Sequence, residues 1–353
     1  MNESLGQLFM IGVSGLELKT EEADFIRDQN IGGVILFAHN YESPAQVAEL
    51  CNSIQKLRGE YPLFISVDHE GGRVQRFKKN FTHFPSLKKM GEVDSPKLVF
   101  EAHQIMGRQL KAVGVNLDFS PCCDILTNEI NTVIGDRSFG TTPEIVEKNV
   151  SAAIRGLQTS GVLACGKHFP GHGGTTKDSH FDLPLVKTPI EMMEKREWIP
   201  FMKAAKSRLD FMMMAHLLVE EIDTEFPTSL SPKAYELLRT VLKFKKIIIT
   251  DDMEMKAVTD KYSFEEAATL AIKAGADMVI YRSFEKSVLA FEAFKERVAK
   301  KVILHQQIED KVNIINEVKK RTLKDFQPVY IPAILKSLHN DQDQVVLEQI
   351  AKN

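Results

Sequence analysis

The chain repeats one pattern through most of its length, in which a short apolar run is followed by a longer amphipathic segment. Eight apolar runs have the length of a buried strand, and they occupy residues 8–13, 33–37, 63–67, 115–119, 163–165, 211–214, 247–249 and 278–281. Segments with helical spacing lie between them, at residues 45–57, 97–113, 143–158, 189–206, 232–242 and 264–274. Strand signals that alternate with helix signals predict βα units and a parallel sheet.

The number of runs and the length of 353 residues fit a closed (β/α)8 barrel of the TIM type. A doubly wound open sheet is the competing arrangement, but its Gly-x-Gly-x-x-Gly turn is missing after the first run. We therefore expect an α/β protein with one catalytic barrel over residues 1–325. Residues 326–353 are polar and interrupted by two prolines, so they are expected as an extension that packs outside the barrel.

Composition excludes several kinds of partner. A net charge of −3 gives no electrostatic reason to expect a nucleic acid, and no apolar run reaches the length of roughly 20 residues that spans a membrane. The N-terminus lacks the basic start of a secretory signal, and the four cysteines form no Cys-x-x-Cys pair. We expect a cytoplasmic monomer that binds a small ligand, with reduced cysteines and without a nucleic-acid or membrane partner.

The segment over residues 167–180 is the densest group of reactive side chains, and it reads KHFPGHGGTTKDSH. Its glycines permit a loop that bends sharply after the fifth apolar run. Asp178 and His180 are two residues apart, close enough for the carboxylate to reach the imidazole. A carboxylate partner raises the pKa of a histidine and fixes its tautomer, which prepares it for acid/base catalysis.

Other polar residues follow the ends of the apolar runs, where a barrel collects its catalytic groups. They are Asp68, Arg76, Asp124, Arg137, Lys167, His168, His216, Asp251 and Asp252. Carboxylates and cations in one place suit a neutral polyhydroxylated ligand such as a sugar, because charged hydrogen bonds are short and strong. A glycosidase needs a carboxylate nucleophile and a proton donor. Asp251 is a candidate for the first role and His180 for the second.

Structural interpretations compete with these roles. Aspartate is a favoured residue for capping helices, and that interpretation is preferred for Asp252 but not for Asp251. Gly71–Gly72 is typical of a turn, although the flanking Asp68 and Arg76 favour a ligand loop. His216 is expected as a half-buried histidine with satisfied hydrogen bonds.

Residues 167–180 resemble the signature of family 3 glycoside hydrolases of the β-N-acetylglucosaminidase branch. The bacterial cytosolic enzymes of peptidoglycan recycling are the most similar type. Further matches occur in the same order along the chain, at residues 32–37, 68–77, 137–139 and 250–255. Thr250 departs from the serine usual before the nucleophile, and Cys122 and Cys123 stand where small aliphatic residues are common.

The resemblance implies a (β/α)8 barrel and a role for each matching residue. Asp251 is the nucleophile of a retaining exo-glycosidase with a covalent glycosyl-enzyme intermediate, and His180 is the general acid/base with Asp178 as its partner. The residues that hold the terminal sugar are Asp68, Arg76, Arg137, Lys167 and His168. The implied substrate is a non-reducing N-acetylglucosamine, β-1,4-linked to anhydro-N-acetylmuramic acid with or without peptide. No cofactor and no metal are expected.

Four alternative functions compete with this interpretation. A family 3 enzyme with a similar site can be a phosphorylase, because a histidine acid would let phosphate approach without repulsion. It can also be a β-glucosidase of broader substrate specificity. A metal-dependent amidohydrolase has a His-x-His pair after the first strand, which supplies metal ligands. This chain has IGVS at residues 11–14 instead, which disfavours that alternative. A sugar-binding protein on an inactive barrel is disfavoured, because every expected catalytic position is filled.

Overall fold

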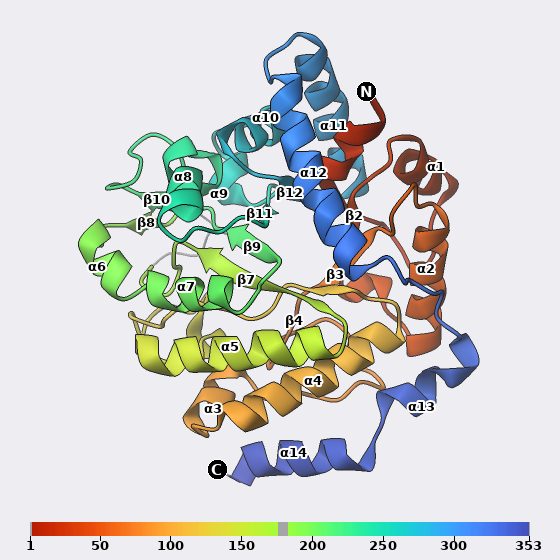
Figure 1. Cartoon of the computed structure of the whole chain (residues 1–353), viewed down its shortest axis with the longest axis vertical. Coiled ribbons are helices and arrows are strands. Elements are labelled where there is room, and N and C mark those ends of the chain that lie inside the picture. The colour runs from red at the N-terminus through yellow and green to blue at the C-terminus, as the bar shows by residue number, and fades with distance from the viewer. Residues whose placement is uncertain (1, 176–182, 353) are drawn as a thin grey trace.

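Eight parallel strands close into a barrel in the computed structural model, which describes residues 2–175 and 183–352 (Figure 1). The order around the barrel is β1-β12-β11-β9-β7-β6-β3-β2. Their bounds are β1 Phe9–Gly12, β2 Gly33–Leu36, β3 Phe64–Val67, β6 Leu117–Asp118, β7 Leu163–Phe169, β9 Phe211–Met214, β11 Ile247–Asp252 and β12 Met278–Tyr281. The predicted (β/α)8 barrel is confirmed, and each barrel strand overlaps one of the eight apolar runs.

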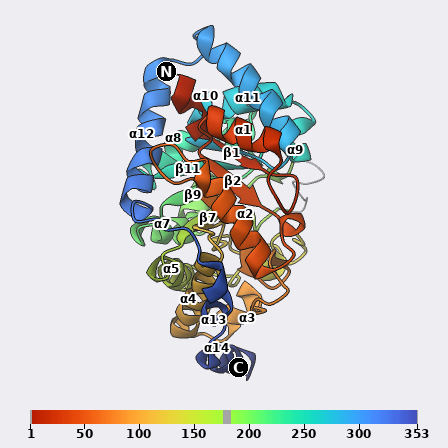
Figure 2. The same ribbon diagram turned by 90° about the vertical axis from the view of Figure 1, so that its right-hand side faces the viewer.

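Helices surround the barrel (Figures 1 and 2). They are α1 Thr20–Asp28, α2 Pro44–Lys56, α3 Leu87–Glu92, α4 Pro96–Ala112, α5 Pro143–Thr159, α6 Ile190–Lys195, α7 Trp198–Lys206, α8 Pro232–Thr240, α9 Lys256–Thr259, α10 Phe264–Ala274, α11 Phe284–Ala299 and α12 His305–Thr322. The prediction of one helix over 189–206 is wrong, since α6 and α7 are separate. Pro200 explains the break, because proline is tolerated in the first turn of α7 but not inside a continuous helix.

Alternate residues of the strands fill the barrel interior, because successive side chains on a strand point to opposite faces. The interior cluster contains Met10, Ile35, Phe64, Leu117, Phe119, Leu163, Cys165, Phe211, Met213, Ile247, Ile249, Met278 and Ile280. Helix α12 closes one end of this cluster with Ile315 and Val318. It runs beside the 3-10 helix η1 (Asn2–Leu8) in both views (Figures 1 and 2).

The C-terminal extension contains a short 3-10 helix, η5 Ile331–Ala333, and two α-helices, α13 Ile334–Leu338 and α14 Asp341–Lys352. Helices α13 and α14 pack on α4 at the outer edge of the molecule (Figure 1), and η5 contacts α2. Gln109 Nε2 donates to the carbonyl of Leu338 at 2.6 Å, and Arg108 forms an ion pair with Asp343. The extension makes specific polar contacts with α4. The boundary at residue 325 stays a prediction.

All four cysteines are buried and free, as the sequence indicated. Among the described helices, none has the length and apolar character needed to cross a membrane.

Candidate active site

Three barrel strands present a charged residue at their carboxyl ends, on the inward face. The inward-facing residues below them are Phe64 and Ser66 on β3, Leu163 and Cys165 on β7, and Ile247 and Ile249 on β11. Because side chains two residues apart on a strand share a face, Asp68, Lys167 and Asp251 continue these rows. The predicted ends of two strands were too early, since β7 extends to Phe169 and β11 to Asp252.

A hairpin brings Arg76 back to Asp68. Strands β4 (His69–Gly71) and β5 (Val74–Gln75) pair in antiparallel fashion, and the turn between them uses Gly71 at φ 94° and Gly72 at φ 55°. A Cβ on Gly71 would lie 2.6 Å from the carbonyl oxygen of Pro85, so glycine is required there. Arg76 Nη2 then donates to Asp68 Oδ2 at 3.2 Å. The turn predicted from the glycine pair is confirmed.

Lys167 lies between two carboxylates. Its Nζ is 2.8 Å from Asp68 Oδ1 and 2.6 Å from Glu70 Oε1. Arg137 approaches Glu70 from the other side and donates to both of its oxygens, through Nε at 2.8 Å and Nη2 at 2.7 Å. The four residues of this chain of alternating charge are, in order, Asp68, Lys167, Glu70 and Arg137. Glu70 contacts both cations of the chain. Glu70 was not among the predicted site residues, although its spacing of two from Asp68 was an available signal.

The network keeps its carboxylates ionised. Burial opposes ionisation of Glu70, but Arg137 and Lys167 lower its pKa to about 2. Burial likewise opposes ionisation of Asp68, yet Lys167 and Arg76 hold its pKa well below the usual range. Burial also disfavours the ammonium of Lys167, and the two carboxylates together raise its pKa above the ordinary value. The site therefore offers fixed charges of both signs to a ligand with many hydroxyl groups.

His168 is held by the fully buried carboxylate of Asp124. Oδ2 of Asp124 lies 2.7 Å from Nδ1 of His168 and 3.1 Å from its main-chain nitrogen. Oδ1 accepts a hydrogen bond from the main chain of His172 at 2.7 Å. Burial opposes ionisation of Asp124, but His168 lowers the pKa of the carboxyl to about 2. Because Asp124 is an ionised acceptor, Nδ1 of His168 donates to it, and Nε2 lies 3.2 Å from Nη2 of Arg137.

Asp251 is a carboxylate at the carboxyl end of β11. Its Oδ1 accepts from the main-chain nitrogen of Asp252 at 2.8 Å. Burial raises the pKa of Asp251, but the nearby His168 and His216, together with this hydrogen bond, bring the net pKa below the ordinary value. Asp251 is therefore ionised at neutral pH, as a nucleophile must be.

The neighbouring residues have structural roles. Asp252 accepts from the main-chain nitrogen of Glu254 at 3.0 Å and so stabilises the turn after β11. Helix α9 begins at Lys256 and has Met255 at its N-cap. The prediction that Asp252 caps the next helix is therefore wrong. His216 is fully buried rather than half-buried, with Nδ1 2.6 Å from Ser229 Oγ and Nε2 3.0 Å from the carbonyl oxygen of Asp252. Its hydrogen bonds are satisfied, as predicted.

Asp178 and His180 lie outside the described residues, so their predicted roles remain predictions. The described chain before them is fixed near the site. Asn131 Nδ2 donates to the carbonyl of His172 at 2.8 Å and to Thr175 Oγ1 at 3.2 Å.

Within residues 2–175 and 183–352, one group could be considered for a metal ion: Cys122, Asp124 and His168. The Cys122 thiol donates to Asp124 Oδ2 at 3.1 Å, and the same oxygen accepts two bonds from His168. These donors already satisfy the carboxylate, so the group is explained as a hydrogen-bonded support for His168. The first strand is followed by Val13 and Ser14 rather than the His-x-His pair of an amidohydrolase.

These features define a (β/α)8-barrel enzyme that presents an ionised carboxylate and paired charges to a polar ligand. The sequence model of the glycosyl hydrolase family 3 N-terminal domain matches residues 1–318. The chain belongs to this family and is a glycoside hydrolase, which confirms the resemblance seen in the sequence.

Relatives of known sequence and structure agree with this assignment. The chain is 38% identical to a beta-hexosaminidase of Nitrosomonas eutropha over 78% of this chain and 80% of the relative, and 37% identical to that of Methylococcus capsulatus over 82% and 87%. It is also similar to a family 3 beta-N-acetylglucosaminidase from Paenibacillus sp. FPU-7. That match has a TM-score of 0.96 and 35% identity, and covers all of this chain and 68% of the other.

Proposed function

We propose that this protein is a retaining exo-β-N-acetylglucosaminidase. Its substrates would be peptidoglycan fragments in which a non-reducing N-acetylglucosamine is β-1,4-linked to anhydro-N-acetylmuramic acid, with or without peptide. The relatives named beta-hexosaminidase support the acetamido sugar. The observation that carries the proposal is the ionised Asp251 at the same barrel end as the Asp68–Lys167–Glu70 chain of charges.

In the proposed reaction, Asp251 attacks the anomeric carbon and the bond to the leaving oxygen breaks. His180, paired with Asp178, gives its proton to that oxygen. The same imidazole then takes a proton from water, whose oxygen attacks the anomeric carbon and releases Asp251. A histidine acid suits this site, because a second carboxylate beside Asp251 would raise the pKa of the nucleophile.

The network of charges supports a proposal for the sugar-binding residues. Asp68 and Glu70 are acceptors, and Arg76, Arg137 and Lys167 are donors. We propose that Asp68, Arg76, Lys167, Arg137 and His168 hold the hydroxyl groups of the terminal sugar. Since Lys167 and Arg137 are already fixed by carboxylates, little side-chain entropy is lost when the sugar binds.

A trapping experiment tests the nucleophile. A 5-fluoro N-acetylglucosaminyl fluoride should label Asp251, as located by mass spectrometry of peptides, and Asp251→Asn should not be labelled. Labelling of another side chain would refute the assignment.

For the acid/base, His180→Ala should lose far more rate on substrates with poor leaving groups than on activated aryl glycosides. Equal losses on both would contradict the acid role of His180.

Substrate and location have separate tests. Paired aryl β-glycosides with and without the 2-acetamido group distinguish the proposed enzyme from a β-glucosidase, and sugar 1-phosphate formed in added phosphate would identify a phosphorylase. EDTA should have no effect on the rate of hydrolysis, whereas it would inhibit a metal-dependent amidohydrolase. A cytoplasmic location is proposed from the four buried, free cysteines, and fractionation of cells tests it. We also propose that the protein is a monomer, and light scattering tests this.

A further inference from the structure

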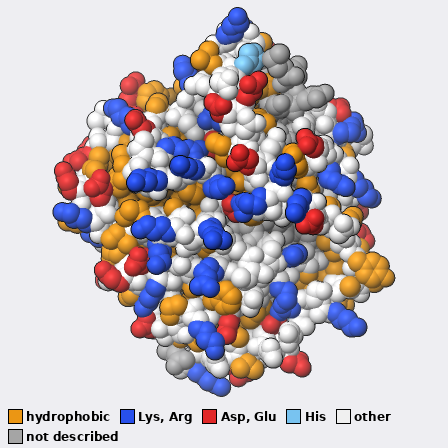
Figure 3. Space-filling view, viewed as in Figure 1, with side chains coloured by type: hydrophobic (Ala, Val, Ile, Leu, Met, Phe, Trp, Pro, Cys, Tyr) orange, Lys and Arg blue, Asp and Glu red, His pale blue; other side chains and the backbone are white. Residues whose placement is uncertain are grey.

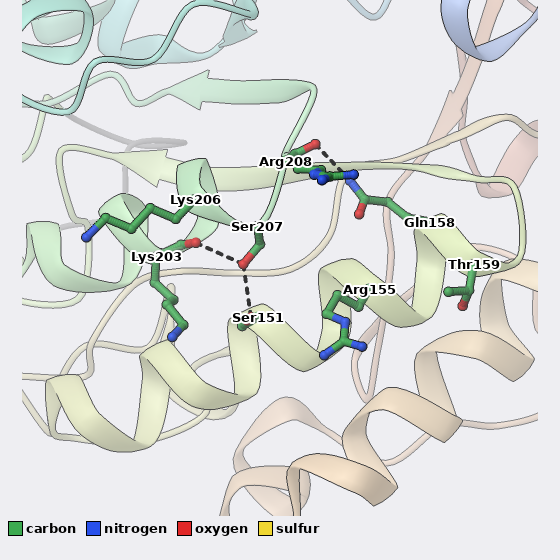
Figure 4. A pocket seen from close by; sticks show the side chains of 8 residues that line it. All are labelled: Ser151, Arg155, Gln158, Thr159, Lys203, Lys206, Ser207 and Arg208. Carbon is green, nitrogen blue, oxygen red and sulfur yellow. Dashed lines mark hydrogen bonds between the residues drawn. The ribbon is translucent and has the colours of Figure 1, made fainter.

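A cavity lies between α5 and α7 on the outside of the barrel. The cavity has a volume of about 530 Å³ and is lined by Ser151, Arg155, Gln158, Thr159, Lys203, Lys206, Ser207 and Arg208 (Figure 4). We call it the basic groove. Four of its eight lining side chains are cationic, and none is a carboxylate.

The floor of the basic groove is held by hydrogen bonds. The hydroxyl groups of Ser151 and Ser207 lie 2.9 Å apart, and Ser207 Oγ donates to the carbonyl of Lys203 at 2.9 Å (Figure 4). Gln158 Nε2 donates to the carbonyl of Arg208 at 2.9 Å. These contacts tie α5 to the end of α7, so the groove has a fixed shape beneath its long cationic side chains.

The cations of the groove are not neutralised by neighbours. Within the described part of the chain, Arg155, Lys203, Lys206 and Arg208 form no ion pair, although the guanidinium of Arg155 lies 6.0 Å from the ring centre of Phe100. Elsewhere on the protein, many lysines and arginines face carboxylates, as Lys167 does. Four neighbouring unpaired cations repel one another, and a bound anion would relieve that repulsion.

The positive surface continues beyond the basic groove. An adjoining cavity of about 420 Å³ is lined by Arg208 as well, together with Lys243, Lys245, Lys246, Arg321 and the carboxylate of Asp210. Asp210 is buried and paired with Arg321. The two cavities thus bring together eight cations and one buried carboxylate, on a chain whose net charge is −3. Lys and Arg side chains are spread across this face in Figure 3.

The connected cavities indicate the chemical class of ligand. Arginine, lysine and hydroxyl groups together bind phosphate oxygens well. Single-stranded nucleic acids also require aromatic rings on which bases stack, and the one aromatic residue lining either cavity, Phe244, is buried. Two adjoining cavities that share Arg208 suit a chain-like ligand better than a flat bilayer. We infer that the basic groove and the adjoining cavity bind a linear polyanion with phosphates along its backbone and without bases.

This surface is far from the catalytic end. Lys206 and Arg208 precede β9, and Lys243 and Lys246 precede β11, so they lie at the amino ends of the strands. Asp251 lies at the opposite, carboxyl end. A polyanion bound here would hold the protein while leaving the barrel mouth open, and the inference does not depend on the proposed substrate.

Binding of long-chain inorganic polyphosphate, measured by calorimetry, tests the inference. Lys206→Gln combined with Arg208→Gln should weaken binding by about tenfold, because both side chains are exposed and contact the ligand. Four phosphate contacts predict a loss of roughly 50-fold in affinity between about 50 and 200 mM salt. The matched control is Lys233→Gln with Lys273→Gln, which changes the same charge at exposed sites on α8 and α10.

Equal binding by the groove variant and the control would overturn the inference, as would tighter binding to single-stranded DNA or to vesicles of anionic lipid than to polyphosphate. Thermal melting verifies that both variants fold. Hydrolysis of an aryl glycoside should be unchanged in both, which separates this surface from the proposed active site.

Discussion

Nδ1 of His168 lies 2.7 Å from Oδ2 of Asp124, so a fully buried carboxylate fixes the orientation of an imidazole at the barrel mouth. The same carboxylate also accepts main-chain hydrogen bonds from His168 and His172. One aspartate thereby positions both the side chain and the backbone of this segment.

Asp124→Asn should lower kcat/KM by about 10–100-fold, in the range seen when a supporting hydrogen bond to a site histidine is lost. The amide has one acceptor oxygen where the carboxylate has two, so one donor of His168 or His172 would face an N–H group. Steady-state kinetics on an aryl N-acetylglucosaminide measure the effect. Asp136→Asn, at an exposed ion pair with Arg73, is the control. Unchanged kinetics for Asp124→Asn would contradict the positioning role.

Glu70→Gln should destabilise the protein by about 3–5 kcal/mol, because it leaves Lys167 and Arg137 with an uncharged partner in a buried site. Urea unfolding at neutral pH measures this loss. Glu101→Gln, which removes a half-buried partner of the exposed Lys97, should change stability by less than about 1 kcal/mol.

The same substitution has a pH signature. The pKa of Glu70 is lowered to about 2 in the folded protein. A lowered carboxyl pKa gives stability that is present above the unfolded value and is lost as the pH falls through the folded value. The difference between wild type and Glu70→Gln should therefore shrink as the pH is lowered from 5 toward about 2. A difference that stays constant would exclude a charged Glu70.

Asp252 should have the opposite pH dependence. Burial, together with the charge of Glu254, raises its pKa to about 7. A raised carboxyl pKa gives stability that is present below the unfolded value and is lost as the pH rises through the folded value. Asp252→Asn should thus flatten the fall in stability between about pH 4 and pH 7, followed by thermal melting. An unaltered profile would show that Asp252 is already ionised at low pH.

Lys319→Met should stabilise the protein by on the order of 1–3 kcal/mol, because the ammonium of Lys319 is fully buried and pairs with no carboxylate among the described residues. Its contacts are Gln7 Oε1 at 2.8 Å and the ring of Phe64, whose centre is 5.0 Å away. Burial lowers the pKa of Lys319 to about 7. The folded protein therefore binds fewer protons than the unfolded chain between about pH 7 and pH 10, and stability contributed by this group rises with pH there. The gain from Lys319→Met should be largest below pH 7 and fade toward pH 10. A gain that grows with pH would disprove this account.

The barrel and part of its site were predictable because they depend on local periodicity. Apolar runs of strand length predicted all eight barrel strands, and the spacing of two residues places Asp68, Lys167 and Asp251 on inward faces. The sequence could not say that Glu70 joins Lys167 to Arg137, since Arg137 and Glu70 are 67 residues apart and meet only when the barrel closes.

By itself, then, the sequence determined the order of strands and helices, the inward rows and the residues of the family signature. Only the tertiary structure decided which charges neutralise one another and which segments close the barrel. Helix α12 is an example, because Ile315 and Val318 seal the barrel interior against strands that lie far away in the sequence. The physical reason is that periodicity acts between neighbours in the chain, while Coulomb pairing and burial depend on distances that folding alone sets.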